Sequence, residues 1–273
     1  MVDEIENEIT KKQFYQKLCD LALYGSNKEF FDTVKILAKL GTVEAVEVLL
    51  KILLHHPKGK HCDECDLPRS AAVTPLIRMW KFAPEKIIPL IPIFCKYNVN
   101  DDHIEENLPE MFDEIGKETL QKAFISGLND YDSLVRFGTL YSLHDHEIMK
   151  NNLLLLIDAY KIETNIPVQN NIESILLENI NEEIAEMFFE LIKNYRIDLN
   201  KSIIENEFYP EDEMTEKIIP IFLRKWKKEK DGTIRGLIHD VVETLVNSFK
   251  EDIHEVFSKD EVKQLQEMGI LEK

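Results

Sequence analysis

The chain has 273 residues, of which 44% are hydrophobic, and it carries 51 acidic against 33 basic side chains, a net charge of −18. Phosphate backbones and anionic membranes are bound through clustered Lys and Arg, so this balance argues against a nucleic-acid or membrane partner. No stretch approaches the ~18 uninterrupted apolar residues of a membrane span, and four cysteines are too few for a disulfide framework. We therefore predict a cytoplasmic protein.

The first predicted elements are a helix over 11–23 and a helical hairpin over 26–54. In the hairpin, two amphipathic segments are separated by Gly41, which suits the left-handed position that ends a helix. Ser26 and Glu29 have the spacing of a capping box, in which each side chain bonds a free amide of the first turn. Two short helices cannot bury their apolar faces alone, so this pattern predicts stacking on similar neighbours.

Residues 55–69 interrupt the pattern; they read HHPKGKHCDECDLPR and are predicted to form an inserted loop. Cys62 and Cys65 have the spacing with which two thiolates reach a single zinc ion, and any two of His55, His56 and His61 could complete a tetrahedral site. The candidate zinc ligands are therefore His56, His61, Cys62 and Cys65. A redox dithiol and an inert loop without metal are the alternatives.

The remainder of the chain repeats the helical rhythm, and strand signals are nearly absent. A helix opened by Pro75 comes first, and a second one from Pro84 is interrupted by Pro89 and Pro92. The later predicted pairs cover 101–116 and 117–128, 132–143 and 147–160, 167–180 and 182–195, and 213–229 and 233–249, with a final helix at 258–269. The unit is about 30–40 residues long, so we predict an all-α protein with a single α-helical repeat domain over 1–273.

Two stretches resemble HEAT-type repeats: GTVEAVEVLLKIL at 41–53 and ENLPEMFDEIGKETLQKAFISGLNDYDSLVRFGTLYSL at 106–143. In the second, a helical pair is followed by Asp132, Val135 and Arg136, which open the next unit. The resemblance implies an α-solenoid, a superhelix of antiparallel helical hairpins, in which Asp and Arg bridge successive loops. Solenoids act by presenting a surface, so it also implies a non-catalytic scaffold or adaptor that binds a protein or peptide. The acidity favours a basic partner.

An enzymatic alternative rests on four His–carboxylate dipeptides. One HEAT-repeat enzyme family, the deoxyhypusine hydroxylases, builds a di-iron site from His-Glu pairs, which makes a metal-dependent oxygenase the alternative function. Here only two of the four are His-Glu, and their spacing is uneven: His144-Asp145, His146-Glu147, His239-Asp240 and His254-Glu255. No phosphate-binding glycine loop, nucleophile elbow or zinc-protease motif occurs, so we predict that the protein is not an enzyme and has no cofactor beyond the candidate zinc.

Overall fold

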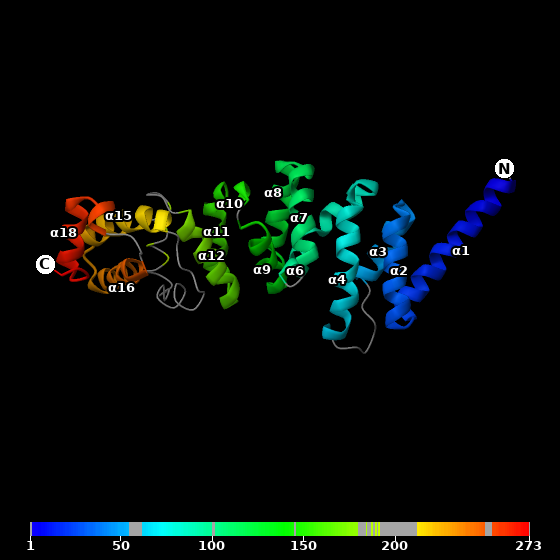
Figure 1. Ribbon diagram of the computed structural model, residues 1–273, viewed down its shortest axis with the longest axis horizontal. Coiled ribbons are helices and arrows are strands. Elements are labelled where there is room, and N and C mark those ends of the chain that lie inside the picture. The colour runs from blue at the N-terminus through cyan, green and yellow to red at the C-terminus, as the bar shows by residue number, and fades with distance from the viewer. Residues whose placement is uncertain are drawn as a thin grey trace. The chain divides into compact units, whose positions relative to one another are not determined.

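The computed structural model is all-helical throughout the residues it describes, which are 2–54, 62–99, 102–144, 146–179, 212–248, 253–272 and positions 184, 187, 189 and 191 (Figure 1). No strand occurs among these residues, which confirms the all-α prediction. No helix in this part of the chain is both long enough and apolar enough to cross a bilayer.

The helices in chain order are α1 (Val2–Tyr24), α2 (Asn27–Leu40), α3 (Val43–Leu54), α4 (Cys62–Arg78), α5 (Pro84–Ile87), α6 (Ile91–Asn98), α7 (Asp102–Ile115), α8 (Lys117–Leu128), α9 (Ser133–Ser142), α10 (Glu147–Lys150), α11 (Leu153–Ile162), α12 (Ile166–Glu178), α15 (Asp212–Lys228), α16 (Gly232–Ser248), α17 (Ile253–Val256) and α18 (Lys259–Met268). Two short 3-10 turns, Trp80–Phe82 and Ile88–Leu90, flank α5. The chain groups into two compact units, Met1–Ser142 and Leu143–Lys273. The prediction of one continuous repeat domain stays a prediction.

In the first unit, helices pack mainly on their neighbours along the chain. Helix α1 contacts α2 and α3, and α2 contacts α3 and α4. Helix α4 then contacts α7, and α6 contacts α7, α8 and α9. Figure 1 shows α2, α3 and α4 side by side, in the order of the sequence.

The α2–α3 hairpin forms as its sequence predicts. Ser26 and Glu29 make a complete capping box at the start of α2. Gly41 ends the helix in the left-handed conformation, with φ of 56°. Thr42 then accepts a hydrogen bond from the amide of Ala45 through its Oγ1, 3.2 Å away, and so caps α3.

The proline-rich segment is broken in the way that proline predicts. Pro84 opens the four-residue α5, a 3-10 turn follows, and α6 begins only at Ile91. Pro89 and Pro92 each occupy one of the first two positions of the element they begin, where the missing N–H costs least.

The second unit contains α11 packed on α12, α15 packed on α16 and α18, and α17 packed on α18. Ser258 and Glu261 form a complete capping box at the start of α18, and Gly269 ends that helix with φ of 84°. The helix predicted over 147–160 is divided into α10 and α11. The division falls at Asn151 and Asn152, a residue type whose side chain competes with helical backbone bonds.

Candidate functional site

The predicted zinc ligands fall at the edge of the described structure. His56 and His61 lie outside the described residues. Cys62 and Cys65 belong to the first turns of α4, but their side chains also lie outside. The prediction of an inserted loop over 55–69 was wrong for residues 62–69, which are helical, and residues 55–61 lie outside the described part of the chain. The zinc site stays a prediction.

The His–carboxylate dipeptides have separate surroundings. His144 pairs through Nε2 with Glu178 Oε2 of α12, at 2.5 Å, whereas its neighbour Asp145 lies outside the described residues. His146 is the N-cap of α10, where its Nδ1 accepts a hydrogen bond from the amide of Ile148. These two histidines therefore have structural partners, and the metal-dependent oxygenase stays a hypothesis.

His239-Asp240, the dipeptide on α16, differs from these because a third metal-ligating side chain, that of Glu243, lies close to it. His239, Asp240 and Glu243 each offer a ligand atom within 4.8 Å of the others. Among the residues that the structure describes, this is the only group of three or more metal-ligating side chains. His254 and Glu255, the fourth dipeptide, lie on the short helix α17.

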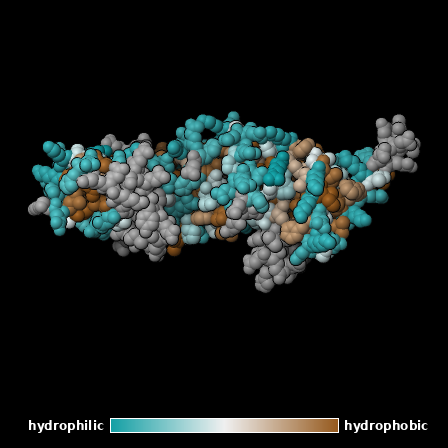
Figure 2. Space-filling model, in the orientation of Figure 1, coloured by the Kyte–Doolittle hydropathy of each residue, from teal (hydrophilic) through white to brown (hydrophobic). Residues whose placement is uncertain are grey.

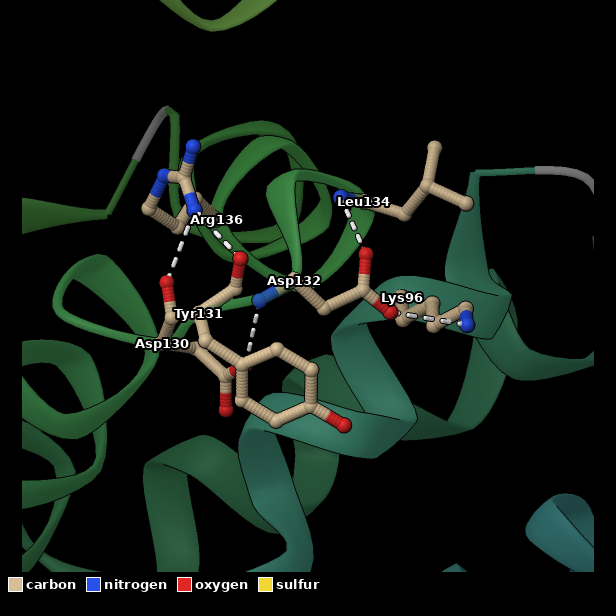
Figure 3. A network of polar contacts seen from close by, with 6 residues as sticks. All are labelled: Lys96, Asp130, Tyr131, Asp132, Leu134 and Arg136. Carbon is tan, nitrogen blue, oxygen red and sulfur yellow. Dashed lines mark hydrogen bonds and ion pairs between the residues drawn. The ribbon is translucent and has the colours of Figure 1, made fainter. Parts of the chain in front are cut away.

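The turn between α8 and α9 carries the HEAT-like element and is tied by hydrogen bonds (Figure 3). Arg136 donates from Nη1 to the backbone carbonyl oxygens of Asp130 and Tyr131, at 2.8 and 3.1 Å. The amide of Asp132 donates to Asp130 Oδ1, at 2.8 Å. These bonds fix the turn on both sides of Tyr131.

Asp132 connects this turn to α6. Its Oδ1 accepts from the amide of Leu134 at 2.9 Å, as at a helix N-terminus, and its Oδ2 pairs with Lys96 Nζ at 3.1 Å. Burial opposes ionisation of this carboxyl, but the Leu134 amide and the Lys96 ammonium outweigh it and lower the pKa of Asp132. The carboxylate thus caps α9 and joins it to an earlier helix.

The turn before α9 and the exposed face of α9 present apolar side chains to solvent. The side chain of Tyr131 is 97% exposed, and Leu134 and Tyr141 on α9 are 58% and 42% exposed. Half-buried Phe137 stacks on Tyr141 with ring centroids 6.4 Å apart. Residues spaced by three or four share one helix face, so Leu134, Phe137 and Tyr141 form an apolar strip along α9, and Tyr131 lies in the turn just before that helix. We name Tyr131, Leu134, Phe137 and Tyr141 the α9 stripe.

A second exposed apolar area lies at the α2–α3 corner. Figure 2 shows mostly hydrophilic surface, with a hydrophobic area over α2 and α3. Leu40, Val43 and Phe82 are each more than a third exposed, and a Cβ atom at Gly41 would be 3.6 Å from the Phe82 ring. The Phe82 ring thus lies beside Gly41 at this corner, whereas Tyr131 is almost entirely exposed.

Comparison with known proteins adds no family to these observations. No protein-family model matches the chain, and no curated protein matches it significantly. The resemblance to HEAT-type repeats therefore depends on the residues of this chain alone.

Proposed function

We propose that the protein is a HEAT-like α-solenoid of the cytoplasm that binds a protein or peptide without catalysing a reaction. The architectural part of the proposal is supported by four ion pairs that join segments of the first unit lying far apart in the chain. Four pairs span 33, 39, 33 and 36 residues: Lys11–Glu44, Glu47–Lys86, Lys81–Glu114 and Lys96–Asp132. These separations fall within the predicted repeat of about 30–40 residues, whereas three hydrogen-bonded pairs of the same unit span 27, 29 and 44 residues: Tyr15–Thr42, Arg78–Asn107 and Asn98–Ser142.

A separation of about one unit length is what stacked hairpins in register would produce. In a stack of similar units, equivalent edges of consecutive units meet, so contacts recur at one unit length along the chain. Ion pairs at the surface stabilise a fold very little, so these pairs are a consequence of the helix packing rather than its cause. The contacts of α1, α2 and α3 are consistent with this arrangement, because these helices pack on the helices next to them in the chain, whereas α6 packs most extensively on α9, across the α7–α8 pair.

The exposed α9 stripe is the observation that best supports the proposed binding function. Tyrosine supplies a large contact area with few rotatable bonds, and it is enriched at the centres of protein interfaces. The bonds from Arg136 to the carbonyls on either side of Tyr131 Cα hold the turn before any partner arrives. A site that is already ordered loses less conformational entropy on binding.

The charge around the stripe favours a partner segment with basic residues next to apolar ones. Asp130 and Asp132 flank Tyr131, and the whole chain has a net charge of −18. Complementary charge raises association rates and selects against acidic partners. The proposed ligand is therefore a protein or peptide with both aromatic or aliphatic and basic side chains.

The proposal is tested by selecting binding peptides from a random library and measuring their affinity for variants. We expect the selected peptides to be basic and apolar, and Tyr131→Ala to weaken binding by about 2 kcal/mol, roughly 30-fold. Tyr24→Ala is the matched control, since Tyr24 is 73% exposed at the end of α1 in the same unit. Equal affinity for the Tyr131→Ala and wild-type proteins would contradict the role of the stripe.

A further inference from the structure

We propose that His239, Asp240 and Glu243 on α16 bind a divalent transition-metal ion of the Zn²⁺ class. This site is separate from the Cys62–Cys65 segment, and it does not depend on the binding function proposed for the α9 stripe. The three ligand atoms lie within 4.8 Å of one another.

His239 and Glu243 are four residues apart on a 17-residue helix, so they lie one turn apart on the same face. Asp240 is adjacent, with its Oδ1 3.2 Å from His239 Nδ1. Zinc bonds of about 2.0–2.2 Å to nitrogen and oxygen place two tetrahedral ligands about 3.3 Å apart. Moderate side-chain rotations would therefore bring all three ligand atoms around one ion.

The helix that carries the ligands is well anchored. Ile238 and Val242, the neighbours of His239 and Glu243, are completely buried, and α16 packs against α15. The His239 side chain is 32% exposed and that of Asp240 is 49% exposed. The imidazole is therefore partly held by packing, while solvent can supply the remaining ligands of a bound ion.

The donor set decides which class of ion is preferred. One imidazole nitrogen with two carboxylate oxygens suits zinc and similar transition metals, whereas Mg²⁺ and Ca²⁺ prefer oxygen ligands alone. Arg235 is one turn before His239, and its positive charge opposes a bound cation. Its guanidinium lies over the Trp226 ring of α15, 4.2 Å from the ring centroid. We therefore expect a weaker site than a closed structural zinc centre.

The test is a calorimetric zinc titration of the full chain carrying Cys62→Ser and Cys65→Ser, so that these thiols cannot contribute. We expect one zinc ion to bind per chain in this background, with no heat from Mg²⁺ at the same concentration. His239→Ala and Glu243→Gln should each weaken zinc binding at least tenfold. Glu243 is exposed, so the second variant remains informative if the first fails to fold.

His103→Ala is the matched control, because His103 on α7 also faces a carboxylate, Glu106, with Nδ1 4.0 Å from Oε2. That variant should bind zinc as the Cys62→Ser, Cys65→Ser parent does. The proposal is overturned if the parent binds no zinc, or if the His239 and Glu243 variants keep its affinity. It is equally overturned if His103→Ala weakens zinc binding as much as His239→Ala, since binding would then be a general property of the acidic surface.

Discussion

Gly138 of α9 lies directly against the backbone of Cys95 in α6. A Cβ atom at position 138 would be 2.3 Å from the carbonyl oxygen of Cys95 and 2.7 Å from the Cα of Lys96. Both neighbours are backbone atoms, which cannot rotate away, so only glycine allows the two helices to approach this closely. The contact also places Lys96 where its side chain reaches Asp132. The close packing of α9 on α6 thus also positions the ion pair of Lys96 with Asp132, in the turn before α9.

Substitution of Gly138 by Ala should destabilise the first unit. Forcing a methyl group into this contact must displace a helix, which costs about 1–3 kcal/mol. Urea unfolding followed by circular dichroism measures the loss. Gly236→Ala is the control, since Gly236 lies within α16 with no atom within 4 Å of an added Cβ. It should stabilise the chain by about 0.5–1 kcal/mol, because alanine favours a helix over glycine. A Gly138→Ala protein as stable as the wild type would refute the close approach.

The Asp132 carboxylate should make a pH-dependent contribution to stability. Its pKa in the folded protein is lowered, because the Leu134 amide and Lys96 outweigh the effect of burial. A lowered pKa stabilises the fold above the unfolded value of about 3.9, and this contribution is lost as the pH falls through the folded value. We expect Asp132→Asn to cost about 1 kcal/mol at pH 7, since a charged hydrogen-bond acceptor is replaced by a neutral one.

The measurement is the free energy of unfolding of both proteins between pH 7 and pH 2. The difference in the free energy of unfolding between wild type and Asp132→Asn should be constant down to about pH 4. It should disappear at lower pH, where the wild-type carboxyl is protonated. Asp130→Asn is a useful control, because Asp130 accepts a bond from the Asp132 amide but is not paired with Lys96 in the network of Figure 3. A difference that persists unchanged at pH 2 would mean that Asp132 does not act through its charge.

Local sequence signals predicted the helix ends well, because the groups that end a helix are near each other in the chain. Both capping boxes and the left-handed Gly41 are present as the spacing indicates. Cys95 is completely buried on α6, and this burial raises the pKa of its thiol to about 12. The start of α4 was missed, since residues 62–69 have no helical period in their apolar residues.

The side-chain partners that lie far apart in the chain could not be predicted in this way. His144 is adjacent to Asp145 in sequence, yet its partner in the structure is Glu178, 34 residues away. Glu173 is 3% exposed, although a glutamate is usually found at the surface. The exposure of Tyr131 also depends on how α8 and α9 meet. In the sequence, the only indication that Tyr131 is exposed is its position between Asp130 and Asp132.

The buried pair of Tyr160 and Glu173 should contribute measurably to the stability of the second unit. The Tyr160 hydroxyl donates to Glu173 Oε1, at 2.5 Å, between α11 and α12. Burial, together with this bond, raises the pKa of Tyr160. Tyr160→Phe removes the donor from a buried carboxyl oxygen, which should cost about 2 kcal/mol in the free energy of unfolding.

Because of the same pair, we expect the stability of the protein to depend on pH in the alkaline range. A pKa raised in the folded state stabilises the protein below the unfolded value of about 10, and this contribution is lost as the pH rises further. The difference between wild type and Tyr160→Phe should therefore narrow above about pH 10. Tyr141→Phe serves as the comparison, because Tyr141 is exposed and its loss should change stability by less than about 0.5 kcal/mol. If both substitutions have equally small effects, the buried hydrogen bond is not a stabilising contact.

The proposed solenoid predicts an extended particle in solution. A compact domain of 273 residues has a radius of gyration of about 19 Å, whereas stacked hairpins that contact only their neighbours extend along one axis. Small-angle X-ray scattering should give a value well above that for a compact domain, with an asymmetric distance distribution. Light scattering on the same sample must show a monomer, because a dimer would also raise the radius. A monomer with a radius near 19 Å would indicate a helical bundle in which distant hairpins pack together, and the repeat assignment would then be wrong.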